Sequence, residues 1–197
     1  AFRQDDIVIV KKIVYNKYQV ENMQKKLPIF QTKRLLIREI EDRDCYDMYE
    51  YASLPYVGPS AGWEPHANIS HTKNMIKLFK GKIDYGQLGV FAIVLKESNK
   101  MIGTIELHSH IKGFKAELGY TINPKYWGKG YAVEASRAVI AWGFDFLGLK
   151  RIECLMFCAN QQSVRVCEKL GLTFEGKRRK GYMLYDGTIN DVLYYSI

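Results

Sequence analysis

The most constraining feature of the sequence is a turn rich in small residues between a strand-like and a helix-like segment. Residues 117–122 have the apolar composition of a strand, and the pattern over 131–140 is helical. Between them, Gly128, Gly130 and Ala132 leave the backbone open to close approach. The free N–H groups and the dipole at the start of a helix attract anions, so this turn predicts a phosphate-binding site.

Two common phosphate-binding motifs do not fit this turn. A Walker loop needs Ser or Thr after Gly-Lys, but Gly130 follows Lys129 here. A Rossmann fingerprint needs a small residue where Val133 stands, and an acidic residue about twenty positions later, near Lys150. By itself, the Gly128-x-Gly130 pattern is equally compatible with a tight turn that binds no ligand.

The complete stretch 123–132 resembles the acyl-CoA-binding turn of the GNAT acetyltransferase superfamily, which has the motif Gln/Arg-x-x-Gly-x-Gly/Ala. Gly130 and Ala132 match its last two positions, whereas Trp127 stands where the family often has Gln or Arg. The form Tyr-Trp-Gly-x-Gly-Tyr-Ala is similar to the branch of ribosomal-protein serine/alanine N-acetyltransferases. A Thr-x-Arg-Leu segment beginning at Thr32 resembles the opening of the same branch.

The order of predicted elements agrees with this resemblance. Hydrophobic periodicity and turn residues predict strands at 32–38, 90–95, 101–110, 116–122, 151–157, 173–184 and 189–195, and helices at 42–51, 71–82, 131–146 and 161–170. Asp42 or Asp44 is expected to cap the first helix and Ser70 the second, with a long loop over 55–68 between them. The resemblance implies an α/β fold of the GNAT type: one twisted, mostly antiparallel sheet with a splayed parallel pair and helices on both faces.

The resemblance divides the chain into two parts. Residues 32–197 are expected to form the acetyltransferase domain, and 197 residues suffice for one domain with a sizeable core. Residues 1–31 form an N-terminal extension, whose pattern is compatible with a strand pair, a helix or a partner-binding arm.

The composition restricts the partners. The net charge of +8 is compatible with nucleic acid or with any polyanionic ligand, including a coenzyme that carries three phosphates, and the resemblance favours the coenzyme. The basic run 177–180 is interpreted as a solvated hairpin edge, with phosphate or partner contact as the alternative. Four cysteines without a Cys-x-x-Cys pair, and no apolar run long enough to span a bilayer, predict a cytoplasmic protein with reduced thiols and no membrane partner.

The resemblance implies acetyl-CoA as the co-substrate and indicates which residues would bind it. The backbone of Tyr120, Thr121 and Ile122 would pair with the pantetheine arm. Asn160 would bond the pantetheine, and Ser163 would lie near the sulfur as a proton donor; for both, helix capping is the alternative. The diphosphate would be held by the turn residues Trp127, Gly128, Lys129, Gly130, Tyr131 and Ala132.

Acetyl transfer to an amine requires a group that accepts the amine's proton. Glu117 approximately matches a glutamate that some family members use as this base, and Glu106 is its rival. Either could instead pair with a cation, and an N-terminal amine with a pKa of about 7.7–8.0 is partly deprotonated unaided. By resemblance, Trp63 faces the acceptor; its alternative role is to pin a surface loop.

The histidines do not predict a metal site. His108 and His110 share one face of a predicted strand, but no convincing third ligand accompanies them, so we expect no metal. His66 and His71 are interpreted as surface or loop residues.

The leading hypothesis is an N-acetyltransferase that transfers an acetyl group directly from acetyl-CoA to a primary amine. By resemblance, the acceptor is the α-amine of a protein N-terminal Ser or Ala, as in ribosomal-protein acetylation. The alternatives are a small amine, such as an aminoglycoside or polyamine, and a non-catalytic acyl-CoA-binding regulator. The sequence leaves the acceptor and the oligomeric state open, with a homodimer among the options.

Overall fold

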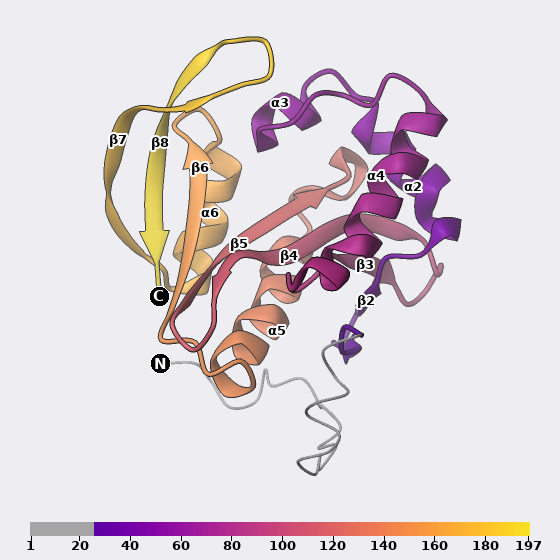
Figure 1. The fold of residues 1–197 in the computed structure, drawn as a ribbon, viewed down its shortest axis with the longest axis horizontal. Coiled ribbons are helices and arrows are strands. Elements are labelled where there is room, and N and C mark those ends of the chain that lie inside the picture. The colour runs from indigo at the N-terminus through magenta and orange to yellow at the C-terminus, as the bar shows by residue number, and fades with distance from the viewer. Residues whose placement is uncertain (1–25) are drawn as a thin grey trace.

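The structure, a computed structural model, describes residues 26–197 and arranges them as one mixed sheet with helices against it (Figure 1). Within these residues, eight strands run in the order β1-β2-β3-β4-β5-β6-β8-β7. The strands are β1 (Phe30–Gln31), β2 (Leu35–Glu39), β3 (Phe91–Leu95), β4 (Met101–Ile111), β5 (Lys115–Ile122), β6 (Arg151–Phe157), β7 (Thr173–Met183) and β8 (Ile189–Ser196). The helices are α2 (Cys45–Ala52), α3 (Val57–Ala61), α4 (Ile69–Gly81), α5 (Tyr131–Asp145) and α6 (Gln161–Leu170), with the shorter 3-10 helices η3 (Asp42–Asp44), η4 (Lys82–Tyr85) and η5 (Pro124–Tyr126).

Neighbouring strands of the sheet are antiparallel except for β5 and β6. These two are parallel because helix α5 crosses back over the sheet between them. Their ladder pairs residues 115–117 with 151–153, and the strands then diverge (Figure 1). The predicted fold class, with its splayed parallel pair, is confirmed.

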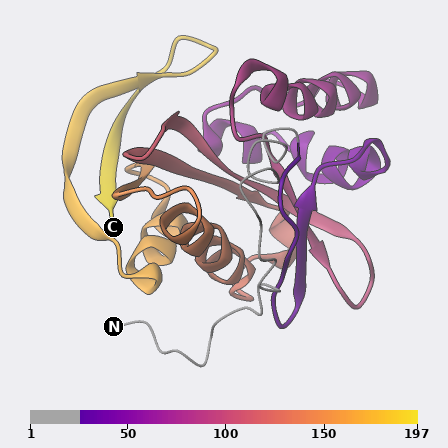
Figure 2. The ribbon, with the colours of Figure 1, turned by 60° about the horizontal axis from the view of Figure 1, so that its bottom comes forward.

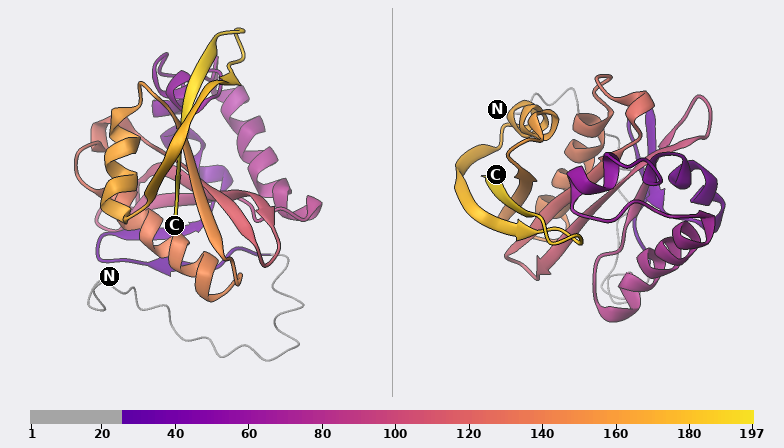
Figure 3. Two further views of the ribbon diagram at one scale, coloured as in Figure 1. Left: turned by 90° about the vertical axis from the view of Figure 1, so that its left-hand side faces the viewer. Right: turned by 90° about the horizontal axis from the view of Figure 1, so that it is seen from above.

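Helices lie on both faces of the sheet, with α5 and α6 on one side and α2 and α4 on the other (Figure 3). Strand β3 is buried on both faces because all five of its residues are apolar. Its residues alternate between two cores: Phe91 and Ile93 belong to the larger one on the α5 side, and Ala92 and Val94 to the smaller one under α2 and α4. None of the helices in residues 26–197 combines the length and apolar character that crossing a bilayer requires.

Helix α5 packs closely on the sheet because small residues face it. Ala135 and Ser136 are fully buried, and a Cβ added to Gly143 would come within 2.9 Å of Ile152 on β6. This close packing fixes the position of the helix start, and with it the position of the glycine-rich turn.

The β7–β8 hairpin curves away from the rest of the sheet, and its tip approaches the segment around α3 (Figures 1 and 2). The Tyr182 hydroxyl donates a hydrogen bond of 3.2 Å to the carbonyl oxygen of Gly62. Two segments that are far apart in the sequence therefore meet over the same end of the sheet. Lys177, in the basic run at the sheet edge, pairs with Asp191 at 2.7 Å.

Three predicted helix details are wrong. The segment 42–51 divides into η3 and α2, because the Asp44 carboxylate binds Arg38 and the Glu41 N–H and does not cap α2. Helix α4 begins at Ile69, one residue before the expected cap Ser70. Its cap is Asn68, whose side chain accepts a hydrogen bond from the His71 N–H. The predicted loop 55–68 contains the short helix α3.

The predicted N-terminal extension, residues 1–31, lies mostly outside the described residues. Its last two residues belong to the sheet: β1 pairs Phe30 with Ile37 and Gln31 with Leu36. Phe30 is buried in the larger core and packs against Phe91. The folded domain therefore begins no later than Phe30.

Candidate functional site

The turn between β5 and α5 has glycines where the backbone is left-handed. Gly128 has a φ of 74°, and Gly130, the N-cap of α5, has a φ of 79°. A Cβ on Gly128 would meet no atom within 4 Å, so the space beside the turn is open. No side chain caps α5 at Gly130, so its first N–H groups remain available to a ligand.

The residues around these glycines hold the turn in place. The Trp127 indole donates a hydrogen bond of 2.7 Å to the carbonyl oxygen of Ile122 and so fastens the turn to the end of β5. The carbonyl oxygen of the exposed Lys129 accepts a hydrogen bond of 2.9 Å from Arg34. Tyr131 and Ala132 are half-buried and pack against the larger core.

A gap opens between β5 and β6 where their ladder ends after Glu117. Beyond that point, Tyr120, Thr121 and Ile122 pair with β4 on their other side. Their β6-facing backbone groups have no strand partner in the described sheet. An extended chain can bond to such groups as an added strand does.

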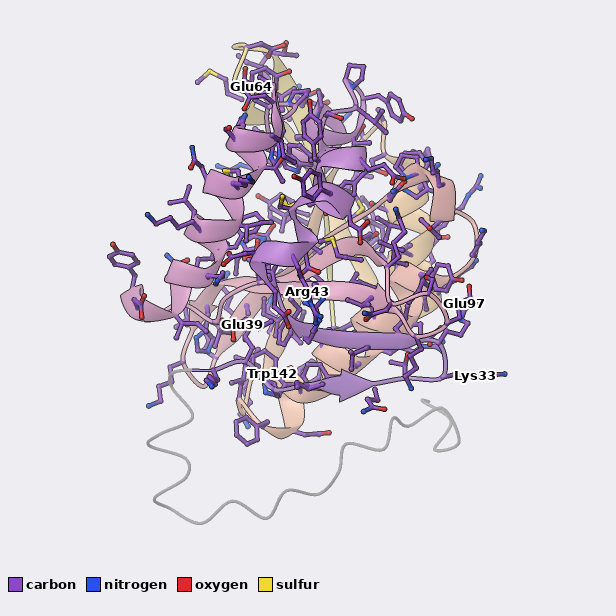
Figure 4. All side chains as sticks on the ribbon, turned by 90° about the vertical axis from the view of Figure 1, so that its right-hand side faces the viewer. Lys33, Glu39, Arg43, Glu64, Glu97 and Trp142 are labelled. Carbon is purple, nitrogen blue, oxygen red and sulfur yellow. The ribbon has the colours of Figure 1, made fainter. Side chains whose placement is uncertain are left out.

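The gap leads into a cavity of about 670 Å³ that reaches from the start of α6 to α4. It brings together seven of the residues predicted for the site: Trp63, Glu106, Glu117, Tyr120, Thr121, Asn160 and Ser163. The other predicted residues, Ile122 and 127–132, lie at the end of β5 and in the turn that follows. A third carboxylate, Glu64, also lines the cavity, and Figure 4 shows it near the end of the molecule where α4 starts.

Glu117 faces His108, its cross-strand neighbour on β4. The Nε2 atom of His108 lies 3.6 Å from Oε1 of Glu117. Burial raises the pKa of the Glu117 carboxyl above its usual value, while His108 opposes the shift and the nearby Glu153 adds to it. The imidazole has room because Gly119 has no side chain: a Cβ there would lie 3.1 Å from the His108 ring. A half-buried carboxyl with a raised pKa is suited to accept a proton.

Glu106 is in a different environment. Its carboxylate accepts a short hydrogen bond from the Lys82 ammonium, which follows α4. Both side chains of this ion pair are about three-quarters buried. The pair occupies the Glu106 carboxylate, so Glu117 is the better placed of the two candidate bases.

At the start of α6, Asn160 and Ser163 form a helix cap. The Asn160 side chain accepts a hydrogen bond of 3.1 Å from the Ser163 N–H. Capping, the alternative role considered for both residues, is therefore present. The Tyr120 hydroxyl in turn donates to Ser163 Oγ at 3.1 Å, so the Ser163 hydroxyl proton is left to be donated elsewhere. Burial raises the pKa of Tyr120, which keeps its hydroxyl protonated as a donor.

The far end of the cavity is aromatic. Trp63 packs against His66, and the His66 ring stacks on His71 with centroids 4.5 Å apart. His66 lies in the loop between α3 and α4, as one of its two interpretations has it, but it is not a surface residue: it is 5% exposed, and its Nδ1 lies 2.8 Å from the Thr72 hydroxyl. Burial lowers its pKa to about 4, so the ring is neutral at pH 7.

The two histidines of β4 are separated by a backbone irregularity. Ser109 has a φ of 51°, and the register of β4 with β5 shifts after His108. The even alternation that would place His108 and His110 on one face is therefore interrupted. Within residues 26–197, no group of three or more His, Cys, Asp or Glu side chains could hold a metal ion.

Two residues that the sequence did not assign to the site have contacts in it. Arg34 bonds to the turn, and His108 contacts the candidate base. Arg34 belongs to the Thr-x-Arg-Leu segment, which indicated the family but gave no role to Arg34 itself. The position of His108 follows from the β4–β5 register, which the sequence does not show.

The residues present fit acetyl-CoA. An open turn with left-handed glycines would hold a diphosphate, and unpaired backbone groups of β5 would hold the pantetheine arm. The gap between β5 and β6 would bring the thioester to the cavity that contains Glu117.

Comparisons with known proteins agree with this geometry. The family described as Acetyltransferase (GNAT) domain matches residues 34–173. The uncharacterized N-acetyltransferase YoaA of Bacillus subtilis is 34% identical over 171 residues, which cover 86% of this chain and 96% of that protein. The ribosomal protein uS5-alanine N-acetyltransferase of Escherichia coli is 29% identical over 172 residues, covering 81% of this chain and 85% of that protein. The crystal structure of a GNAT-family acetyltransferase from Bacillus anthracis superposes with a TM-score of 0.77 at 30% identity, covering 86% of this chain and 98% of that one. The chain therefore belongs to the GNAT acetyltransferase family and is an N-acetyltransferase.

Proposed function

We propose that this N-acetyltransferase uses acetyl-CoA to acetylate the α-amine of a protein N-terminus that begins with Ser or Ala. The observation that carries the proposal is the gap between β5 and β6: it opens beside Tyr120 and Thr121, which line the cavity that contains Glu117 and lie just before the glycine-rich turn. Acetyl-CoA supplies the acetyl group as a thioester.

The cavity favours a cationic acceptor. Glu64, Glu106 and Glu117 line it; Lys82 pairs with Glu106 from outside, and the lining itself contains no Lys or Arg. An acidic hollow in a protein of net charge +8 attracts the ammonium form of an amine. The relative from Escherichia coli is named as a ribosomal protein uS5-alanine N-acetyltransferase, which supports a protein amine as the acceptor.

The residues divide the chemistry as follows. Glu117 accepts a proton from the bound ammonium, and the free amine then forms the C–N bond. An N–H of the Tyr120–Ile122 backbone polarises the acetyl carbonyl. As the C–S bond breaks, Ser163 donates its hydroxyl proton to the leaving sulfur, and the second proton that the attacking nitrogen loses as the amide forms restores the Ser163 hydroxyl. The Tyr120 hydroxyl, hydrogen-bonded to Ser163 Oγ, stabilises that oxygen during the transfer. Asn160 holds the start of α6 so that Ser163 stays in place. Trp63 packs against the residue that follows the amine.

The acceptor is tested by thiol release with the full chain and acetyl-CoA. The panel contains peptides that begin with Ser or Ala, the same peptides with a blocked N-terminus, a polyamine and an aminoglycoside. We expect release with the free peptides alone, and mass spectrometry should place the acetyl group on the α-amine. Turnover of the polyamine or aminoglycoside alone would overturn the peptide acceptor, and acetyl-CoA binding without turnover of any amine would indicate a regulator.

The cofactor turn is tested by Gly130→Val with Gly148→Val as the matched control. Both glycines have a positive φ, so both variants carry a similar backbone strain, but Gly148 lies after α5 and far from the turn. Calorimetric titration with acetyl-CoA should show a large loss of affinity in Gly130→Val only. Equal affinity in two folded variants would disprove the assignment of the turn.

A further inference from the structure

The segment between β1 and β2 contacts the start of α5. The Thr32 hydroxyl and the Arg34 N–H both donate to Oε1 of Glu134, at 2.5 and 2.9 Å. The Arg34 Nε donates to Oε2 of the same carboxylate at 2.6 Å. Glu134 lies in the first turn of α5, about a hundred residues after Arg34 in the sequence.

The same guanidinium also reaches the turn before the helix. Its second terminal nitrogen, Nη1, donates a hydrogen bond of 2.9 Å to the carbonyl oxygen of Lys129. The guanidinium carbon lies 4.3 Å from the centre of the Tyr131 ring, over its face. Arg34 therefore bridges the residue before the N-cap and the first turn of α5 with one planar group.

The bond to Lys129 determines where the next amide points. A trans peptide directs its C=O and its N–H to opposite sides. Because the Lys129 carbonyl points to Arg34, the Gly130 N–H points away from Arg34. An anion-binding turn needs its N–H groups on the ligand side and its carbonyls on the other side, and Arg34 enforces this arrangement from behind.

The contact between Arg34 and Glu134 also compensates the negative charge of Glu134. Burial by itself would raise the pKa of Glu134, but the hydrogen bonds from Thr32 and Arg34 outweigh it and lower the pKa. The carboxylate is therefore charged and lies next to the turn proposed for a diphosphate. Arg34 pairs with it at 2.6 Å and removes the repulsion that a bound phosphate would meet.

A departure from the family motif points to the same conclusion. Trp127 stands where the resemblance expects Gln or Arg, and its indole bonds to β5. The turn therefore lacks a cation or an amide at that position. Arg34 contacts the turn from a different element.

We propose that Arg34 is the positioning residue of the diphosphate-binding turn, orienting the Gly130 amide and neutralising Glu134. The inference rests on the proposed acetyl-CoA site. It predicts that Arg34 affects only substrates that carry the diphosphate. A residue that merely stabilised the fold would affect all acetyl donors alike.

The experiment compares acetyl-CoA with S-acetylpantetheine, a donor without phosphates, in the wild-type protein, Arg34→Gln and Lys33→Gln. Lys33 is the exposed neighbouring cation and projects away from the protein (Figure 4), so its variant controls for a change of charge. Arg34→Gln should raise the KM for acetyl-CoA about tenfold or more with kcat nearly unchanged, the size expected for a lost charge-assisted hydrogen bond. Its kcat/KM for S-acetylpantetheine should equal that of the wild type, and Lys33→Gln should match the wild type with both donors.

Two further variants make the test independent of one substitution. Arg34→Lys keeps the charge but has no planar fork, so it should not restore the wild-type KM. Glu134→Gln in the Arg34→Gln background removes the carboxylate that has lost its partner, so it should lower the KM for acetyl-CoA below that of Arg34→Gln alone without affecting S-acetylpantetheine.

Two results would overturn the inference: an unchanged KM for acetyl-CoA in Arg34→Gln, or an equal loss with both donors. The wild-type protein tests the proposed function separately. If it used both donors equally well, the diphosphate site itself would be wrong, whatever Arg34 does.

Discussion

Glu117 and Glu106 face the same cavity but have different partners. Glu106 is paired with Lys82, whereas Glu117 lies beside the His108 ring at 3.6 Å, with its side chain about four-fifths buried. A buried carboxylate without a close cation destabilises the folded state when it is charged. The same feature makes Glu117 a better proton acceptor, so activity and stability are opposed at this residue.

Replacing Glu117 with Gln should separate these two effects. Loss of the base should lower kcat about a hundredfold or more, with the affinity for acetyl-CoA unchanged. The raised pKa means that the folded state binds the proton more tightly, so stability falls as pH rises from the usual carboxyl value through the raised one. Glu117→Gln does not titrate and should be more stable than the wild type at pH 7, as measured by denaturant unfolding.

Glu106→Gln is the matched control. It leaves Lys82 without its partner, so it should be less stable than the wild type and keep most of its activity. If Glu106→Gln lost activity and Glu117→Gln kept it, the assignment of the base would be wrong.

A second prediction at the scale of single residues concerns the space beside Gly119. In Gly119→Ala, the new Cβ would lie 3.1 Å from the His108 ring, which must move by a few tenths of an ångström. We expect kcat to fall about tenfold because the Glu117–His108 pair is displaced, with unchanged acetyl-CoA affinity. The control is Gly81→Ala, where a Cβ meets nothing within 4 Å. Wild-type kinetics in Gly119→Ala would show that the position of the ring does not matter.

At the scale of elements, the site depends on contacts between segments that are far apart in the sequence. Glu50 on α2 accepts hydrogen bonds from Asn123 at 3.0 Å and from Lys100 at 2.8 Å. Asn123 is the residue at which the turn begins, and its own side chain accepts a hydrogen bond from the Lys125 N–H. Helix α2 thus helps to hold the first residue of the cofactor turn.

This contact should be visible in the pH dependence of stability. The Lys100 hydrogen bond holds the pKa of Glu50 at about 2. A lowered carboxyl pKa stabilises the fold above the usual value of about 4.3, and this stabilisation is lost as pH falls toward 2. Glu50→Gln should therefore be less stable than the wild type by about 1 kcal/mol at pH 7, because the partly exposed pair is screened, and equal to it near pH 2.

Thermal unfolding across this pH range measures the difference. Glu97→Gln is the control, because Glu97 is an exposed carboxylate at the surface (Figure 4). A stability gap for Glu50→Gln that stayed constant from pH 7 to pH 2 would contradict the role of its charge.

At the scale of the whole molecule, a chain with a net charge of +8 contains a cavity lined by three glutamates. The net positive charge of the chain attracts a polyphosphate cofactor, and the carboxylates inside the cavity attract an amine. The cofactor and the acceptor would then approach the sheet from opposite faces and meet at the gap between β5 and β6.

This arrangement predicts that salt affects the two donors differently. The KM for acetyl-CoA should rise severalfold between about 0.05 and 0.5 M salt, because the screening length shortens from above 10 Å to a few ångströms. S-acetylpantetheine is uncharged, so its KM should stay constant. A KM for acetyl-CoA that did not change with salt would mean that the net charge has no part in cofactor binding.

The local sequence determined what depends on neighbouring residues: strands and helices with strong periodicity, the left-handed glycines of the turn, and the family motif. It was less successful at helix starts. The Asp44 carboxylate, which can cap a helix, binds Arg38 in the structure, and of Asn68 and Ser70, which can both cap α4, Asn68 does so. Only the tertiary structure distinguished Glu117 from Glu106, since both residues are half-buried glutamates on strands and differ in what other strands and helices bring beside them. The same holds for Arg34 and Glu134. Their guanidinium and carboxylate are a hundred residues apart in the sequence and meet only because α5 packs against the sheet beside β2.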